Sequence, residues 1–389
     1  MNLPHILDNI IDLFKPKGES VLGIDIGSSS IKVVQVRNKM GQAILETYGE
    51  VALGPYAEVE IGRAVKLRGE QMVVATNDVL KESNSTTKIG GVSIPLSSSL
   101  ITTMKVPRLN DNLEEMVAME ARRYIPVSLS EVTLDWQVIP SLPKVNSNVT
   151  ASVRSGQPEN ASEVSELESD AQTVESTNVL IVAVHTETIN QLKTMTDQVG
   201  LECRFFELEA FSTIRAVANR QIKTSVIVDF GAGSTKIYVI DQGVIRVSHV
   251  VSFGSQDLTL AIARSTGMPI AEAERLKRTE GIPDTLRGVN LSRLMEGSVS
   301  FLANEVDKVI RNYQSHDGSI VEEVVLSGGG VNVKGLPKLF VERAPVSVRV
   351  ADPFANLMAP AFLQKILQDI GPSFSVAIGA ALRAAGEGK

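Results

Sequence analysis

The sequence predicts an α/β protein whose two lobes face each other across a cleft. Residues 20–36 and residues 226–240 repeat one pattern: a strand rich in β-branched residues, an Asp and a Gly/Ser turn, and a second strand. A third strand, at 324–327, ends in three consecutive glycines. At 389 residues the chain is too long for one hydrophobic core and suits two or three domains.

Composition and charge limit the kinds of partner the chain can bind. Hydrophobic residues make up 43% and charged residues 21%, as in ordinary soluble globular proteins. A net charge of −7 argues against nucleic acid, because phosphate backbones are bound by clustered Lys and Arg. The single cysteine, Cys203, fits a reducing compartment. No apolar run approaches the roughly eighteen residues of a membrane span, and no secretory leader is visible, so we expect a cytoplasmic protein.

Two segments stand outside the repeated pattern. Residues 3–14 have the spacing of an amphipathic helix that ends before Pro16. Its acidic face favours docking on protein over docking on anionic lipid. Residues 141–178 are acidic, lack aromatic residues and are rich in Ser, Asn, Thr and Val, which predicts a disordered loop. Strand-like residues 135–139 and 179–184 flank this loop, and we expect them to pair.

Helical patterns connect the remaining strands. Asn110 or Asp111 is placed to cap a helix that continues to about residue 123. A helix at 187–199, a short strand at 203–206 and a helix at 209–220 then lead to the second copy of the repeat.

Superposing the two copies suggests a phosphate site. The matched pairs are Asp25 with Asp229, Gly27 with Gly231, Ser30 with Ser234, and Lys32 with Lys236. A Gly/Ser hairpin tip can turn backbone N–H groups toward a phosphate, and an Asp behind the tip can hold a water bound to Mg²⁺. One such hairpin alone is more often an ordinary turn. Two matched copies favour the phosphate site, with the two Asp side chains facing each other across the cleft.

The glycine cluster at 328–330 points to a nucleotide base. Glycines at a strand end let a flat ring approach the backbone closely. A Walker loop is excluded because Leu336 stands where its Lys is required, and a dinucleotide fingerprint is excluded because its glycine spacing is missing.

These motifs together resemble the phosphate 1, phosphate 2 and adenosine motifs of the actin, heat-shock chaperone and sugar kinase superfamily. Glu274 and Lys277 resemble its Glu-x-x-Lys helix, which contacts ribose and purine, and residues 375–381 resemble its second connecting helix. The implied ligands are ATP and Mg²⁺, with Mg²⁺ held by Asp25 and Asp229 through water. The residues expected to contact the nucleotide are Asp25, Gly27, Ser28, Ser29, Ser30, Lys32, Asp229, Gly231, Gly233, Ser234, Thr235, Glu274, Lys277, Gly328, Gly329, Gly330 and Val331.

Within that superfamily the chain resembles the PilM family of type IV pilus assembly. The resemblance is carried by 23–36, 120–126, 135–138, 208–212, 327–336, 351–356 and 372–379. It implies a two-lobed actin-like ATPase (ribonuclease H-like) fold with an FtsA-like 1C subdomain. The expected units are an N-terminal helix at 1–19, subdomain 1A at 20–100, 1C at 101–190, a return to 1A at 191–222, lobe two (2A and 2B) at 223–370, and a connecting helix at 371–389.

The family resemblance also implies partners and a location. PilM-like proteins bind the N-terminal cytoplasmic segment of the inner-membrane protein PilN in a groove between 1A and 1C, so we expect a PilN-like partner and a position at the cytoplasmic face of the inner membrane. Pilus motor ATPases are a further candidate partner, and a homo-oligomer stays open. The helix at 3–14 and the loop at 141–178 look like additions to the usual pattern.

Whether the chain hydrolyses ATP is left open by the sequence. Glu209, followed by small residues, resembles the Glu that faces the γ-phosphate in filament-forming relatives, but it could equally cap its helix. We expect a slow ATPase at most. Two alternatives are a small-molecule kinase of the same fold and an FtsA-like filament protein. The kinase needs an acceptor pocket in lobe one, and residues 384–389 are too short and polar for the C-terminal membrane helix of FtsA.

Overall fold

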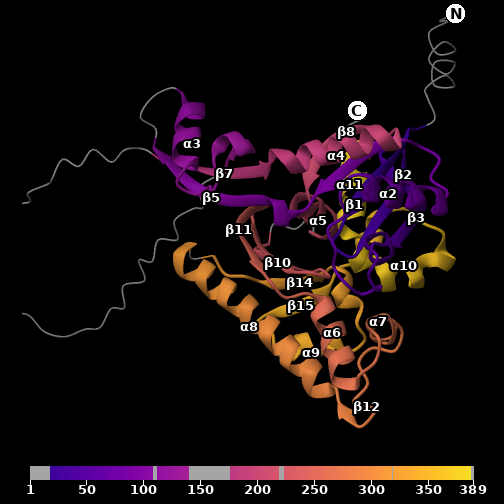
Figure 1. The fold of residues 1–389 in the computed structure, drawn as a ribbon. Helices are drawn as coiled ribbons and strands as arrows, with labels where there is room; N and C mark the ends of the chain where they lie inside the picture. The colour runs from indigo at the N-terminus through magenta and orange to yellow at the C-terminus, as the bar shows by residue number, and fades with distance from the viewer. Residues whose placement is uncertain (1–17, 108–111, 140–175, 219–222, 318, 387–389) are drawn as a thin grey trace, which may run out of the picture.

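The computed structural model describes residues 18–107, 112–139, 176–218, 223–317 and 319–386. It is an α/β structure with two five-stranded sheets and a three-stranded sheet that extends to one side (Figure 1). The predicted helix at 3–14 and residues 141–175 of the predicted loop lie outside the described residues. Within the described ranges, no helix is both long and apolar enough to span a bilayer.

The first five-stranded sheet contains the N-terminal hairpin. Its strands, in spatial order, are β3 (Gln42–Ala52), β2 (Ser30–Lys39), β1 (Ser20–Ile26), β4 (Ile89–Ile94) and β8 (Glu202–Leu208). The first three are antiparallel, and β4 and β8 add in parallel. Helices cover both faces, because β1 and β2 carry almost continuous apolar residues that are buried from both sides. Helices α2 (Glu70–Glu82) and α4 (Thr186–Val199) pack together on one face, and α5 (Glu209–Val217) and α11 (Ser375–Gly386) on the other.

The second five-stranded sheet repeats the architecture of the first. Its strands are β11 (Val244–Val251), β10 (Thr235–Asp241), β9 (Ser225–Phe230), β14 (Glu323–Ser327) and β15 (Ser347–Val350). Again three strands are antiparallel and the last two are parallel. Asp25 lies opposite Lys32 in one ladder and Asp229 opposite Lys236 in the other, so the predicted internal repeat is confirmed at the level of register.

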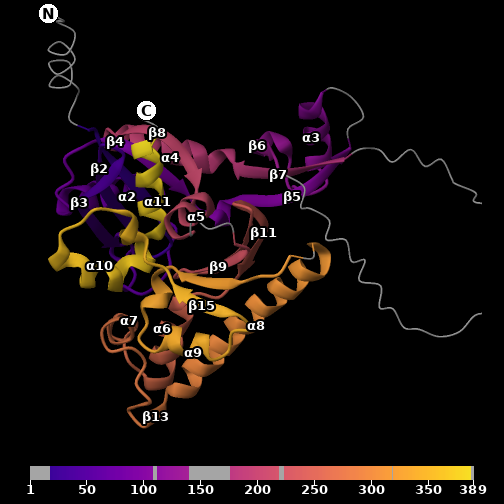
Figure 2. The ribbon, with the colours of Figure 1, turned by 180° about the vertical axis from the view of Figure 1, so that it is seen from behind.

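Helices of the second half enclose this sheet. They are α6 (Ser255–Thr266), α7 (Ile270–Thr279), α8 (Ser292–Asp317) and α9 (Leu336–Val341), with a small hairpin of β12 (Thr285–Leu286) and β13 (Val289–Asn290). Figure 2 shows the long helix α8 running along the outer side of the sheet. Its apolar residues, including Val299 and Val306, are fully buried in the core of this half.

The three-stranded sheet consists of β5 (Ser99–Pro107), β7 (Ser176–His185) and β6 (Val132–Val138), with α3 (Leu113–Ala121) packed against it. Trp136 pairs with Ile181, which confirms that the strands flanking the predicted loop meet. The predicted end of that loop was wrong, because residues 176–178 pair with β5 and belong to β7. The predicted cap of α3 was also wrong: the side chain of Asn112 accepts a hydrogen bond from the Glu115 N–H, while residues 110 and 111 lie outside the described part.

Helices α5 and α11 pack against each other through small residues. A Cβ added to Gly379 would lie 1.8 Å from the carbonyl oxygen of Ser212, so only glycine permits this approach. The buried Glu207 carboxylate ties the pair together by accepting hydrogen bonds from Arg215 of α5 and Arg383 of α11. Helix α5 is shorter than the predicted 209–220, because Ala218 turns to an extended conformation.

Candidate functional site

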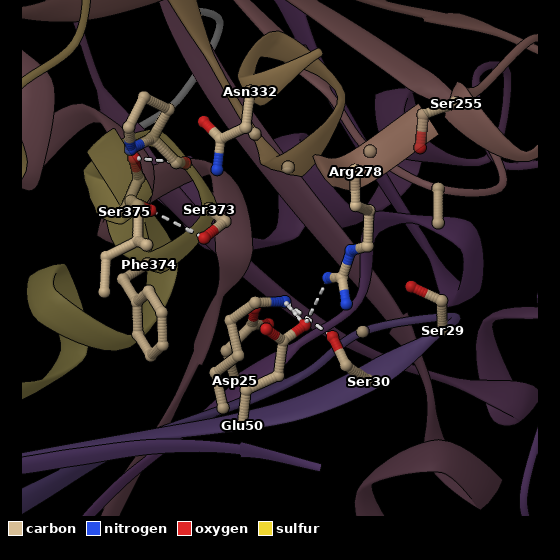
Figure 3. Close-up of a pocket in the computed structure, with 18 of the residues that line it drawn as sticks. Asp25, Ser29, Ser30, Glu50, Ser255, Arg278, Asn332, Ser373, Phe374 and Ser375 are labelled. Atoms are coloured by element: carbon tan, nitrogen blue, oxygen red, sulfur yellow. Dashed lines mark hydrogen bonds and ion pairs between the residues drawn. The ribbon is translucent and has the colours of Figure 1, made fainter. Parts of the chain in front are cut away.

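A cleft of about 1120 Å³ lies between the two repeated hairpins. The tips of β1–β2 and β9–β10 form opposite walls, and α5 contributes Glu209. Further walls come from α7, from the short helix η4 (Gly329–Asn332), and from α10 (Gln364–Ile370) with the η7 turn (Gly371–Phe374) that follows it. Residues from both halves of the sequence therefore meet around one cavity (Figure 3).

The first hairpin supplies a buried acid and a lysine. The turn is closed by a 3.0 Å hydrogen bond from Gly27 N–H to the Ser30 carbonyl, and Lys32 Nζ lies 2.6 Å from Ser30 Oγ. Asp25 Oδ1 accepts a 3.1 Å hydrogen bond from the Ser93 hydroxyl. Burial raises the pKa of Asp25 to about 6, because the nearby Lys side chains offset only part of the desolvation.

The second hairpin places Glu209 against its own lysine. Lys236 Nζ lies 3.1 Å from Glu209 Oε2 and 3.7 Å from Asp229 Oδ2, while Glu209 Oε1 accepts a 2.6 Å hydrogen bond from the Leu96 N–H. Burial raises the pKa of Asp229. Burial alone would lower the pKa of Lys236, but the carboxylates of Glu209 and Asp229 outweigh it and raise that pKa.

The glycine cluster after β14 lies behind the second hairpin. Gly328 has φ of +88°, and a Cβ there would lie 2.5 Å from Asp229 Oδ1, so the position requires glycine. Gly330 rests against the Phe230 ring, where a Cβ would approach to 2.3 Å. The nearest atom to a Cβ on Gly329 would be Ser373 Cβ at 3.6 Å, so this glycine presents open backbone to the cleft.

Helix α7 contributes a buried acid and base pair. Lys277 Nζ lies 2.7 Å from Glu274 Oε2 and donates to the Ser255 carbonyl at 2.9 Å. Glu274 Oε2 also accepts a 2.6 Å hydrogen bond from the Thr259 hydroxyl. Burial lowers the pKa of Lys277. Burial alone would raise the pKa of Glu274, but its contacts with Lys277 and Thr259 outweigh burial and lower that pKa.

Comparison with known proteins identifies the family. The family model described as "Type IV pilus assembly protein PilM" matches residues 23–160 and 162–385, nearly the whole chain. The chain belongs to the PilM family. The PilM assignment agrees with the solved structure of a PilM-PilN type IV pilus biogenesis complex, to which the chain is 22% identical, with 95% of this chain and 99% of that chain covered and a TM-score of 0.73.

A second solved structure gives a more distant likeness. The ethanolamine utilization protein EutJ from Carboxydothermus hydrogenoformans is 16% identical, with 94% of this chain and 89% of that chain covered and a TM-score of 0.51. Identities this low establish the fold alone. The predicted two-lobed actin-like fold of this PilM-family chain is thereby confirmed.

The structure brings most of the predicted nucleotide residues to the cleft. Those that line it are Asp25, Gly27, Ser28, Ser29, Ser30, Lys32, Asp229, Gly231, Glu274, Lys277, Gly328 and Gly329, and the candidate catalytic residue Glu209 lines it as well. Five predicted residues are not among its lining residues: Gly233, Ser234, Thr235, Gly330 and Val331. Thr235 is fully buried and donates its hydroxyl hydrogen to the Phe253 carbonyl, and Val331 packs in the core of the second half.

The cleft also contains residues that the sequence did not single out. Glu50 lies opposite Lys32 in the β-ladder, so extending the first hairpin by one strand would have found it. Arg278 follows Lys277 on the same helix. Asn332 and residues 373–376 are more than 200 positions from the first hairpin, and only the closed fold brings them to the cleft.

The acidic residues of the cleft do not form a direct metal cage. Among the described residues, no group of three or more His, Cys, Asp or Glu side chains is placed to hold a metal ion. Asp25 and Asp229 both line the cleft, and their predicted role of holding Mg²⁺ through water stays a prediction.

Proposed function

We propose that this PilM-family chain is an ATP-binding scaffold of type IV pilus assembly that docks on the cytoplasmic segment of a PilN-like inner-membrane protein. The observation that carries the proposal is the pair of matched hairpins, each with a buried Asp and a Lys, on opposite walls of one cleft. We further propose that the second lobe comprises residues 223–370, that α11 returns to the first sheet, and that the three-stranded sheet is subdomain 1C.

The charge balance of the cleft supports binding of the magnesium complex rather than free nucleotide. Acidic and basic residues line the cleft in equal numbers: Asp25, Glu50, Glu209, Asp229, Glu274 and Asp369 against Lys32, Lys236, Lys277, Arg278, Lys334 and Lys365. Every one of these basic side chains already contacts an acidic side chain or a carbonyl oxygen of the chain. A triphosphate therefore enters a cleft with little spare positive charge, and Mg²⁺ supplies what the protein does not.

The environment of Glu209 supports a scaffold rather than a fast ATPase. A water-positioning carboxylate needs an oxygen directed at the attacking water. Both oxygens of Glu209 are engaged, one by the Leu96 N–H and the other by Lys236. Hydrolysis would require Glu209 to give up one of these partners first.

A second cavity supports a peptide-binding role. It measures about 260 Å³ and lies where the three-stranded sheet joins the first lobe. Its lining residues are Lys66, Arg68, Ser97, Ser98, His185, Glu187, Thr188 and Gln191. We propose that this junction groove receives the PilN-like segment, which would bring the chain to the inner membrane.

Calorimetric titration with MgATP tests the nucleotide site. Asp25→Ala and Asp229→Ala should each weaken binding at least about tenfold, because each removes an anchor for metal-bound water. Asp307→Ala, which removes a surface ion pair with Arg311 on α8, is the control and should bind as the wild type does. Unchanged affinity in both cleft variants would refute the assignment.

A pull-down with the PilN-like cytoplasmic peptide from the same organism tests the partner. Wild-type protein should retain the peptide, and MgATP should change the amount retained. Arg68→Glu should abolish retention because it reverses charge in the junction groove, whereas Arg311→Glu on the exposed face of α8 should not. Equal retention by both variants would show that the peptide binds elsewhere, and no retention by the wild type would refute the partner.

A further inference from the structure

Glu50 breaks the internal repeat at the cleft. In the first sheet Lys32 of β2 lies opposite Glu50 of β3, whereas in the second sheet the matching Lys236 of β10 lies opposite Val250 of β11. The same backbone register therefore carries a carboxylate in one lobe and an exposed apolar side chain in the other. The hairpin architecture does not require an acid at this place, so Glu50 calls for an explanation specific to the first lobe.

One oxygen of Glu50 joins the two lobes. Glu50 Oε1 lies 3.5 Å from Lys32 Nζ and 3.2 Å from Arg278 Nη2. Lys32 in turn contacts Ser30 at the tip of the first hairpin, where the phosphate is expected, and Arg278 extends from α7 of the second lobe. In Figure 3 the side chains of Glu50, Ser30 and Arg278 converge on one point from opposite walls of the cleft.

The carboxylate is charged at neutral pH. Burial would raise the pKa of Glu50, but Lys32 and Arg278 lower it to about 2. The Glu50 side chain keeps 26% of its surface exposed, so water screens its charge while the carboxylate still faces the cleft. A phosphate group that approaches Lys32 therefore meets the negative charge of Glu50, which already contacts that lysine.

Two further contacts from the same part of the chain cross to the second lobe. After β3, Glu60 Oε2 accepts a 3.0 Å hydrogen bond from the Ala271 N–H, and the Ala64 N–H donates to Gln256 Oε1 at 2.8 Å. Neither contact places a charged side chain at the phosphate end of the cleft. At the first hairpin, the Glu50 bridge is therefore the crossing contact that an entering phosphate competes with directly; at the second hairpin, Lys236 also reaches across to Glu209 of α5.

We propose that Glu50 is a built-in competitor of the nucleotide: its carboxylate holds Lys32 and Arg278 together across the cleft, and phosphate must displace it from Lys32. Glu50 then sets both the affinity for MgATP and the coupling of nucleotide binding to the position of the lobes. This inference rests on the proposed function, because it assigns a role within the same nucleotide site. A Glu50 that only stabilises its strand would affect neither property.

The first test measures MgATP affinity by calorimetry. Glu50→Gln keeps the shape and removes the charge, and Glu50→Val reproduces the residue found in the second copy of the repeat. Both should bind MgATP about tenfold more tightly than the wild type. The control is Glu46→Gln on the same strand, whose carboxylate pairs with Arg37 and does not line the cleft. Unchanged or weaker binding in both Glu50 variants would overturn the competition.

The second test measures the position of the lobes without nucleotide. Spin labels on Lys81→Cys of α2 and Glu296→Cys of α8, both exposed, report the distance between lobes in a Cys203→Ser background. Glu50→Val should lengthen and broaden the distances in nucleotide-free protein, and Glu46→Gln should not. Identical distances in wild type and Glu50→Val would overturn the bridging role. A wild type that binds no MgATP would refute the proposed nucleotide function and with it the competition, and the distances would still decide whether Glu50 holds the lobes together.

Discussion

Replacing Asp25 by Asn should stabilise the fold while damaging the nucleotide site. Asp25 is buried, and its neighbours include the carboxylates of Glu209 and Asp229, which add to the cost of its charge. Asn is nearly isosteric, and its side-chain oxygen can still accept the hydrogen bond from Ser93. The substitution therefore removes a buried charge and keeps the hydrogen bond from Ser93.

The size of the effect follows from the pKa. Burial raises the pKa of Asp25 from 3.8 to about 6. A rise of about two units corresponds to roughly 3 kcal/mol, because each unit is worth about 1.4 kcal/mol. A raised acid pKa means that the folded protein binds the proton more tightly than the unfolded chain. The wild type therefore loses this stability as the pH rises from about 4 to about 6, and the loss stays constant above that range.

Thermal unfolding from pH 4 to pH 8 checks this reasoning. The melting midpoint of Asp25→Asn should exceed that of the wild type at pH 7 to 8, and the difference should shrink as the pH falls below about 6. Asp241→Asn is the matched control, because Asp241 is also buried but accepts hydrogen bonds from Thr224 and Tyr313 outside the cleft. A difference between Asp25→Asn and wild type that does not change with pH, or a lower midpoint at pH 8, would refute the argument.

Other variants test the second lobe and the helix contact. Glu209→Gln leaves Lys236 with Asp229 as its remaining ion-pair partner, so the melting midpoint of the protein should fall. The same variant should release phosphate from MgATP no faster than MgATP does in buffer without protein. Faster release would exclude Glu209 from hydrolysis. Gly379→Ala should cost about 3 kcal/mol because its Cβ meets backbone of α5. Gly297→Ala on α8 has no heavy atom within 4 Å of its Cβ and should instead stabilise by roughly 0.5–1 kcal/mol, so equal midpoints for the two alanine variants would contradict the packing account.

The repeated part of the fold was predictable from sequence because local patterns define it. Two strands rich in β-branched residues around a Gly/Ser turn predict a hairpin. Two such hairpins with matched Asp and Lys positions predict the facing walls of the cleft. The three-glycine strand end was predictable for the same reason, although the role of each glycine was not. Gly328 avoids a clash with Asp229 and Gly330 a clash with Phe230, and both depend on neighbours about 100 residues earlier in the chain.

The rest of the cleft could not be read from local patterns. Thr235 was predicted as the last residue of the turn but is the first residue of β10, and its side chain points away from the cleft, because successive side chains along a strand lie on opposite faces. Asn332 and Ser373 carry no local signal and reach the cleft only through packing of the C-terminal part. The cap of α3 was missed because Asn110, Asp111 and Asn112 offer similar capping groups in succession, and the sequence pattern alone does not distinguish them.

The two lysines show how one duplicated structure can serve two purposes. Lys236 is neutralised by Asp229 of its own lobe and by Glu209, the candidate catalytic acid, and the opposite position on β11 is apolar. Lys32 is neutralised by Glu50 of the neighbouring strand, a carboxylate that also contacts Arg278 of the other lobe. Nucleotide that contacts Lys236 would disturb the candidate catalytic acid, and nucleotide that contacts Lys32 would disturb the pairing of Glu50 with Arg278; both are contacts between the lobes. Nucleotide binding would therefore act on the position of the lobes through both hairpins, and only the second hairpin also involves the candidate catalytic acid Glu209.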